Sequence, residues 1–152
     1  MNTPIQVNVR YLHPVCKESP LAYSTQDSVG LDLKACFDQD SLLLASGQRA
    51  ALSTGVAIEI LTPDIAGFVF SRSGLGTKDG LVVSQGVGVI DPDYRGEIIV
   101  SLCNTSATER TIHRGQRIAQ LLFMPAYQAQ LFAVNSLSST PRGEKGFGHT
   151  GK

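Results

Sequence analysis

Short segments in which apolar and polar residues alternate are the feature that most restricts how this chain folds. Residues 5–11, IQVNVRY, show the pattern first. Successive side chains of a β-strand point to opposite faces, so this alternation is typical of a strand with one buried face. The pattern returns over residues 56–60, 66–70, 98–102 and 131–133, each bounded by Gly, Pro, Asp or Ser. We therefore predict short β-strands along the whole chain.

One further segment, residues 117–123, is apolar on nearly both faces and reads RIAQLLF. It is too short for a typical helix, so we predict a strand buried between two layers. Residues 73–80 follow a predicted strand without alternation, and there we expect a helical turn. The 15 Gly and 7 Pro residues supply many turns and disfavour a helix bundle. The expected fold is all-β, a β-sandwich or barrel.

Composition restricts the partners of this chain. Its 13 basic side chains are balanced by 13 acidic ones, so no excess positive charge is present to hold a nucleic-acid backbone, and we expect no nucleic-acid partner. No apolar run approaches the roughly 20 residues of a membrane helix, so we expect no membrane span. The three Cys form no Cys-x-x-Cys pair and the first residues do not resemble a signal peptide, which favours a cytoplasmic protein.

The composition changes at the C-terminal end, where residues 135–152 contain one Leu and one Phe among Gly, Ser, Thr and charged residues. Such a segment buries too little apolar surface to order itself. We predict a β-domain over residues 1–134 and a flexible C-terminal arm over residues 135–152. Residues 146–151 match G-x-G-x-x-G, but no strand precedes them and no helix follows, so this is not a dinucleotide site. The glycine N–H groups and Arg142 still suit an anion; a disordered tail is the alternative.

Residues 88–97, GVIDPDYRGE, join two strand signals through an acidic turn that contains Pro, which predicts a β-hairpin. Asp91 directly follows an apolar Val-Ile pair, where we expect its carboxylate to be partly shielded and able to act as a base. Tyr94 offers a flat face nearby. A hairpin with a purely structural role is the alternative.

Three other segments have candidate polar chemistry. Residues 71–76, SRSGLG, combine hydroxyls, a guanidinium and glycines in a pattern suited to a phosphate, although a solvated turn explains them too. Asp32 lies among apolar neighbours in residues 28–35. An acidic residue in such a place is usually a buried turn aspartate that is held by hydrogen bonds. Residues 114–121, RGQRIAQL, place Gln and Arg in a buried strand, and buried polar groups need partners, of which a bound anion is one.

Taken together, these segments and the arm resemble, in order and spacing, the five motifs of the trimeric dUTPases, the deoxyuridine triphosphate nucleotidohydrolases. The resemblance covers roughly residues 5–151, and GVIDPDYRGE, RGQRIAQL and RGEKGFGHTG are its most specific parts. It implies a jelly-roll-like β subunit in a homotrimer with shared active sites. It also implies Mg²⁺-dependent hydrolysis of dUTP to dUMP and pyrophosphate by water attack at the α-phosphate. That reaction limits uracil incorporation into DNA and supplies dUMP for thymidylate synthesis.

The resemblance also implies roles for individual residues. Asp91 would activate the attacking water, Asp32 would reach Mg²⁺ through a water molecule, and Tyr94 would lie against the deoxyribose. Main-chain groups around residues 86–90 would pair with the uracil edge, and the arm would close over the site. The implied substrate-binding residues are Arg72, Ser73, Gly74, Gln85, Gly88, Ile90, Tyr94, Gln120, Arg142, Phe147, Gly148, His149 and Thr150. Members of the family usually have Ser where this chain has His149. The residue type at the position of Gln85 varies among them.

Two other functions are weighed against this one. A dCTP deaminase of the same fold would carry its catalytic glutamate where this chain has Ser101, and no acidic residue lies between Ile98 and Leu102. Deamination is therefore not expected. A non-catalytic trimer that binds a nucleotide or a protein through the hairpin surface is the second alternative, and the retention of Asp91, Asp32 and the whole arm argues against it.

Overall fold

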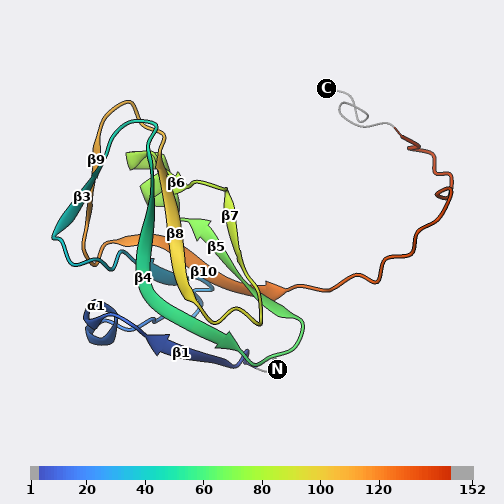
Figure 1. Ribbon diagram of the computed structural model, residues 1–152, viewed down its shortest axis with the longest axis horizontal. Coiled ribbons are helices and arrows are strands. Elements are labelled where there is room, and N and C mark those ends of the chain that lie inside the picture. The colour runs from blue at the N-terminus through green and yellow to red at the C-terminus, as the bar shows by residue number, and fades with distance from the viewer. Residues whose placement is uncertain (1–3, 145–152) are drawn as a thin grey trace.

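Two four-stranded antiparallel sheets form the body of the molecule (Figure 1). The computed structural model describes residues 4–144. In the first sheet the strand order is β1-β4-β8-β6, and in the second it is β2-β10-β5-β7. The strands of the first sheet are β1 (Val7–Tyr11), β4 (Arg49–Ile60), β6 (Leu81–Val83) and β8 (Glu97–Asn104).

The second sheet contains the strands on which the candidate site is built, namely β2 (Leu31–Lys34), β5 (Ile65–Ser71), β7 (Val87–Ile90) and β10 (Arg117–Pro125). A small third sheet pairs β3 (Ser41–Leu44) with β9 (Arg110–His113). Helical structure within residues 4–144 is limited to α1 (Pro14–Glu18) and the π-helical turn η1 (Leu75–Asp79). Neither of these helices is long and apolar enough to cross a membrane. The prediction of an all-β fold is confirmed.

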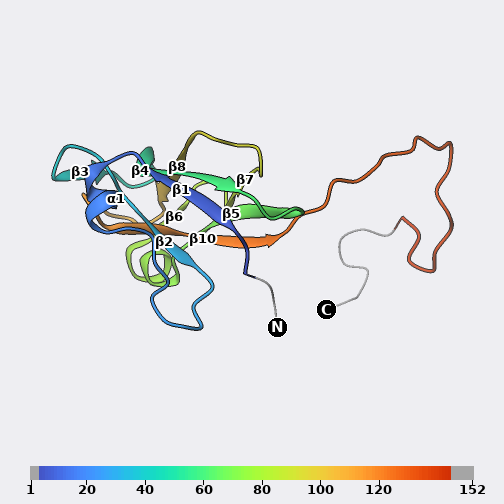
Figure 2. The same cartoon turned by 90° about the horizontal axis from the view of Figure 1, so that it is seen from below.

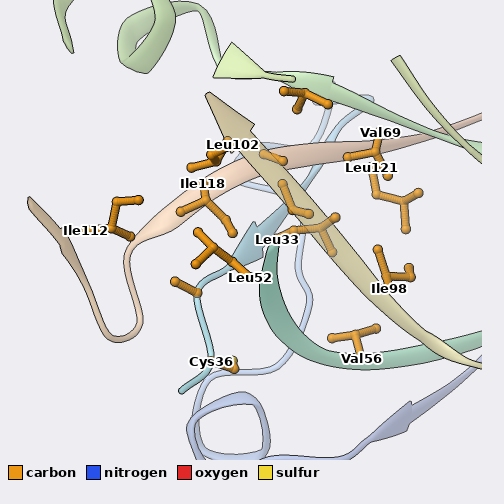
Figure 3. Close-up of a cluster of buried hydrophobic side chains, with 14 of the residues drawn as sticks. Leu33, Cys36, Leu52, Val56, Val69, Ile98, Leu102, Ile112, Ile118 and Leu121 are labelled. Carbon is orange, nitrogen blue, oxygen red and sulfur yellow. The ribbon is translucent and has the colours of Figure 1, made fainter. Parts of the chain in front are cut away.

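The core lies between the two large sheets (Figure 3). On β8, the alternate residues Ile98, Val100 and Leu102 are no more than 1% exposed, because every second side chain of a strand points to the same face. Leu33 of β2 and Leu121 of β10 point into the same core from the other sheet and are fully buried. Each buried side chain of this size contributes about 1.5–3 kcal/mol relative to an exposed one.

Several of the elements predicted from the sequence are confirmed. The strands expected at residues 5–11, 56–60, 66–70, 98–102 and 117–123 correspond to β1, β4, β5, β8 and β10. The helical turn expected within residues 73–80 is η1.

Two predictions are wrong, and the first is the strand at residues 131–133. No strand or helix lies within residues 126–144, which extend away from the body of the molecule (Figures 1 and 2). Leu131 is 88% exposed and Phe132 is 75% exposed, and this alternating segment has no partner strand within residues 4–144.

The second wrong prediction is the hairpin over residues 88–97. Both expected strands exist, but β7 pairs with β5, whereas β8 pairs with β4 and β6. The turn between β7 and β8 therefore crosses from one sheet to the other. The Tyr94 hydroxyl donates a hydrogen bond to the Glu97 carbonyl at 2.9 Å and helps to close this turn. Alternation identifies a strand but does not reveal which strand it pairs with.

The two cysteines nearest the N-terminus meet inside the fold as free thiols. The Sγ atoms of Cys16 and Cys36 are 2.7 Å apart and both residues are buried. Gly55 has a φ of +65°, and a Cβ there would lie only 2.9 Å from the Cys16 Sγ. Burial, reinforced by the hydrogen bond with Cys16, raises the pKa of the Cys36 thiol to about 12. A thiol that stays protonated at neutral pH is a poor nucleophile and metal ligand, which favours a packing role.

Asn104 is the buried polar residue that ties the small third sheet to the first. Its Nδ2 donates to the carbonyls of Leu44 and Thr108, each at 2.8 Å, and its Oδ1 accepts from the Ser106 backbone N–H at 3.0 Å. The side chain is fully buried, so water cannot replace these bonds.

We expect Asn104→Ala to lower the free energy of unfolding by about 1–3 kcal/mol, because it leaves buried backbone groups without partners. Urea unfolding at one protein concentration measures the change. Asn8→Ala is the matched control, since it removes an exposed amide that bonds to Glu59 at 2.9 Å. Equal losses in the two variants would contradict the structural role assigned to Asn104.

Candidate active site

A hollow of about 330 Å³ lies where β5 ends and β10 begins. Four segments distant in the sequence line it: the loop before β2, β2 itself, the residues after β5, and β10. The lining residues are Ser24, Ser28, Val29, Gly30, Asp32, Arg72, Ser73, Gly74, Arg117 and Gln120. The hollow thus gathers several residues that the sequence predicts for phosphate binding.

At the centre of this hollow, the Asp32 carboxylate is held by two guanidinium groups. Arg72 Nε lies 2.8 Å from one carboxylate oxygen, and Arg117 Nη1 lies 3.0 Å from the other. The Asp32 side chain is 17% exposed, whereas that of Arg117 is 52% exposed. Partly solvated ion pairs contribute little to stability, about 0–1 kcal/mol, so this arrangement matters chiefly for the site.

Strand pairing positions Gln120 beside this carboxylate. In the β2–β10 ladder Gln120 lies directly opposite Asp32, and in the β5–β10 ladder it lies opposite Phe70. Its Nε2 donates to the Ser71 carbonyl at 3.2 Å. Gly30 makes room for it, because a Cβ at that position would come within 2.9 Å of the Gln120 Oε1. Ser73 and Gly74 are exposed at the same hollow, directly after Arg72.

The second group of predicted residues lies on β7 and the turn that follows it. Asp91 is exposed in this chain, so the expectation of a partly shielded carboxylate is wrong for the single subunit. Tyr94 is 43% exposed. Gln85 is exposed in the turn before β7, and its Oε1 accepts a hydrogen bond from the Ser84 hydroxyl at 3.2 Å. Gly88 packs closely on β5, since a Cβ there would lie 3.2 Å from the Cβ of Val69.

The two groups lie at opposite ends of β5. Ile90, which precedes Asp91, pairs with Gly67, whereas Arg72 follows Ser71 at the far end of the strand. Four residues of strand span roughly 13 Å, at about 3.3 Å per residue. Asp91 and Tyr94 therefore do not meet the hollow within one chain.

Of the site residues predicted in the C-terminal arm, one lies within the described residues. Arg142 is exposed near the end of the described part of the chain. Phe147, Gly148, His149 and Thr150 lie outside the described residues. Between the body and Arg142, the apolar side chains are 63–88% exposed: Tyr127, Leu131, Phe132, Val134 and Leu137.

The donor set in the hollow fits Mg²⁺ better than a metal that needs a protein cage. Within residues 4–144, no cluster of three or more His, Cys, Asp and Glu residues could hold a metal ion. Mg²⁺ is commonly held by one or two carboxylates together with the phosphates of a substrate. A single carboxylate, Asp32, in a hollow that also offers arginine, serine and glutamine donors fits that mode of binding.

Sequence reasoning gives Arg117 no role of its own, although the structure places it at the site. The sequence feature that points to Arg117 is its place at the start of a predicted buried strand, where a charged group needs a partner. The sequence alone did not reveal that this partner is Asp32, 85 residues away.

An all-β protein with a polar hollow around a single central carboxylate is the class that the fold and the site define. A family model described as dUTPase matches residues 18–151. The deoxyuridine 5'-triphosphate nucleotidohydrolase of Escherichia coli O9:H4 is 45% identical over 149 residues, which cover 97% of this chain and 98% of that protein. The same values hold for the proteins of that name from Shigella boydii serotype 18 and Escherichia fergusonii. The chain belongs to the dUTPase family.

Solved structures share the fold of this chain. A mutant dUTPase of Staphylococcus bacteriophage 80alpha, solved with dUpNHpp, is 24% identical with a TM-score of 0.84, and the match covers 97% of this chain and 99% of that one. The dUTPase of Streptococcus mutans is 28% identical with a TM-score of 0.65, covering 72% and 88%. The prediction of a jelly-roll-like β fold is confirmed.

We expect Gly86→Ala to destabilise the protein by about 1–2 kcal/mol, because Gly86 has a φ of +82° and side chains other than Gly are strained there. Gly74→Ala is the matched control: its φ is −64°, and a Cβ there meets nothing within 4 Å. Thermal melting of both variants measures the difference. Equal melting temperatures for the two variants would show that the turn before β7 does not need Gly86.

Proposed function

We propose that this chain hydrolyses dUTP to dUMP and pyrophosphate by water attack at the α-phosphate. The observation that carries the proposal is the hollow, in which Asp32, Arg72 and Gln120 come together from three strands or strand ends. These are residues for which the resemblance to dUTPases implies metal or substrate binding. The reaction limits uracil incorporation into DNA and supplies dUMP for thymidylate synthesis.

The hollow is the site for the phosphates. Arg72 uses only its Nε for Asp32, and a guanidinium has five N–H donors, so several remain for phosphate oxygens. Ser73, Gly74 and Gln120 supply a hydroxyl, a backbone N–H and an amide around the same space. Such preorganised donors stabilise charge that develops on a phosphoryl group during its transfer.

Asp32 would hold Mg²⁺ through a water molecule. When bound, the metal neutralises phosphate charge and favours attack at the phosphorus. The protein's own contribution is to hold the Asp32 carboxylate between two arginines at the edge of the hollow.

The nucleoside would bind along β7. This strand lies at the end of its sheet, so within the described residues its outer edge has no ladder partner. The main-chain N–H and C=O groups of an edge strand are free to pair with a ligand, and those of Gly88 and Ile90 would pair with the uracil edge. The exposed ring of Tyr94 would lie against the deoxyribose and leave no room for a ribose 2′-hydroxyl. Gln85 lies in the turn beside them.

The active unit we propose is a homotrimer whose sites are shared between subunits. Two observations support it. The hollow and the Asp91 turn lie at opposite ends of β5, so one subunit would supply the phosphate-binding residues and another would supply Asp91 and Tyr94. The exposed apolar residues of segment 127–137 also need a surface outside their own chain. Assembly would give Asp91 the shielding that it lacks in the single chain.

The C-terminal arm would close over the bound nucleotide. Arg142 would contact the γ-phosphate and Phe147 would cover the uracil, with Gly148, His149 and Thr150 adding contacts. Ordering a segment costs about 1–2 kcal/mol per residue in backbone entropy, so closure requires both the base and the phosphates as partners. Closure would exclude water and align the phosphates.

The free buried thiols of Cys16 and Cys36 support a reducing compartment such as the cytoplasm.

We expect Asp91→Asn to bind nucleotide but to lose at least about two decades of the hydrolysis rate, the size of a typical general-base effect. Pyrophosphate release from dUTP measures it, and the same assay on the unaltered protein tests the proposed reaction. Asp93→Asn, in the same exposed turn, is the matched control and keeps the rate. Hydrolysis by Asp91→Asn at the unaltered rate would remove Asp91 from the mechanism.

Shared sites make a second prediction, which concerns mixed subunits. Asp91→Asn and Arg72→Met are each expected to be nearly inactive. When the two are unfolded together and refolded as a mixture, random assembly makes about one site in four from the intact Asp91 of one chain and the intact Arg72 of another. We therefore expect about a quarter of the unaltered activity to return. Failure of the mixture to regain activity, while each variant regains its own assembly, would place the whole site in one chain.

A further inference from the structure

The charged side chains that line the hollow carry a net positive charge. Asp32, Arg72 and Arg117 are the only charged side chains that line it within the described residues. Asp32 and Arg72 alone would be neutral together, so the single net positive charge of the hollow depends on Arg117. A nucleoside triphosphate is strongly negative, and a net positive charge in the hollow attracts it.

Arg117 reaches the hollow because of an irregularity in β10. Ala119 lies opposite Leu33 and Gln120 opposite Asp32, but Arg117 lies opposite Lys34, so the register shifts between residues 117 and 119. The extra residue is Ile118, which is fully buried next to the equally buried Ala119. In a regular strand Arg117 would point to the same face as Ala119, into the core. The β-bulge turns it to the face of Lys34 and Asp32 instead.

The contact that results occupies the half of the carboxylate that Arg72 leaves free. Arg72 Nε bonds one oxygen of Asp32 at 2.8 Å, and Arg117 Nη1 bonds the other at 3.0 Å. A carboxylate with a partner on one oxygen only is able to rotate about its last bond, whereas partners on both oxygens fix its plane.

We propose that Arg117 is a positioning residue of this site, which acts on the nucleotide by holding the second oxygen of Asp32. Its place on the bulge fixes the plane of the Asp32 carboxylate, so that Arg72 retains its remaining donors for the phosphates and Asp32 faces the hollow in one orientation. The inference rests on the proposed function, in which this hollow receives the triphosphate of dUTP with Mg²⁺.

The test is a double-mutant cycle between Arg117 and Asp32, read by calorimetric binding of dUpNHpp in the presence of Mg²⁺. When Asp32 is present, Arg117→Gln is expected to weaken binding about tenfold, since directly contacting groups couple strongly. In the Asp32→Asn background the same change is expected to weaken binding by less than about threefold, because the group through which Arg117 acts is gone.

Arg117→Lys provides the conservative variant and also covers the possibility that Arg117→Gln does not fold. It keeps the charge but lacks the planar fork, so we expect intermediate affinity. The Mg²⁺ concentration that gives half-maximal binding is expected to rise in the same order, an effect that loss of stability alone would not produce. Arg114→Gln is the matched control: it removes an exposed ion pair with Asp40 at 2.7 Å, one turn before β10, and leaves binding unchanged.

The outcomes separate the possible roles of Arg117. Equal losses in the two backgrounds would show that Arg117 contacts the phosphates itself, and no loss in either would show an idle ion pair; both results overturn the inference. Failure of the unaltered protein to bind dUpNHpp would overturn the proposed function instead. The inference is supported only when the unaltered protein binds and the loss depends on Asp32.

Discussion

The pairing of β10 with two neighbours is the constraint on which the rest of this structure depends. β10 lies between β2 and β5 in the second sheet and is paired along both edges. Its apolar residues Ile118, Ala119 and Leu121 are fully buried in the core. Gln120, which lies among them in the sequence, lines the hollow. The same hydrogen-bonded register that closes the core therefore sets the distance between Gln120, Asp32 and the end of β5.

The arrangement of the second sheet keeps two groups of candidate site residues apart within one chain. β5 separates the phosphate hollow at one end from the Asp91 turn at the other, and a strand is too stiff to bring its ends together. A site that needs both parts must draw them from different copies. The apolar side chains exposed over residues 127–137 are consistent with such an assembly, because nothing within residues 4–144 covers them.

Much of the fold was predictable because alternation directly reports which side of a strand is buried. It identified β1, β4, β5, β8 and β10. The resemblance to dUTPases implied roles for Asp32, Arg72, Ser73, Gly74 and Gln120, and these residues line one hollow. Strands of three or four residues, such as β6 and β2, are too short to show a period. The segment at 131–133 has the right pattern for a strand but lacks a partner strand in the described part of the chain, and pattern alone does not supply one.

The sequence by itself determined the all-β class, the main strands and the chemical groups of the site, since side-chain periodicity and residue type are local properties. Tertiary structure alone decided which strands are neighbours. It placed β7 and β8 in opposite sheets in place of a hairpin, left Asp91 exposed, and turned Arg117 toward Asp32 through a bulge at Ile118. These outcomes depend on pairing between segments far apart in the chain, and that pairing is set by the packing of the whole core and not by any one segment.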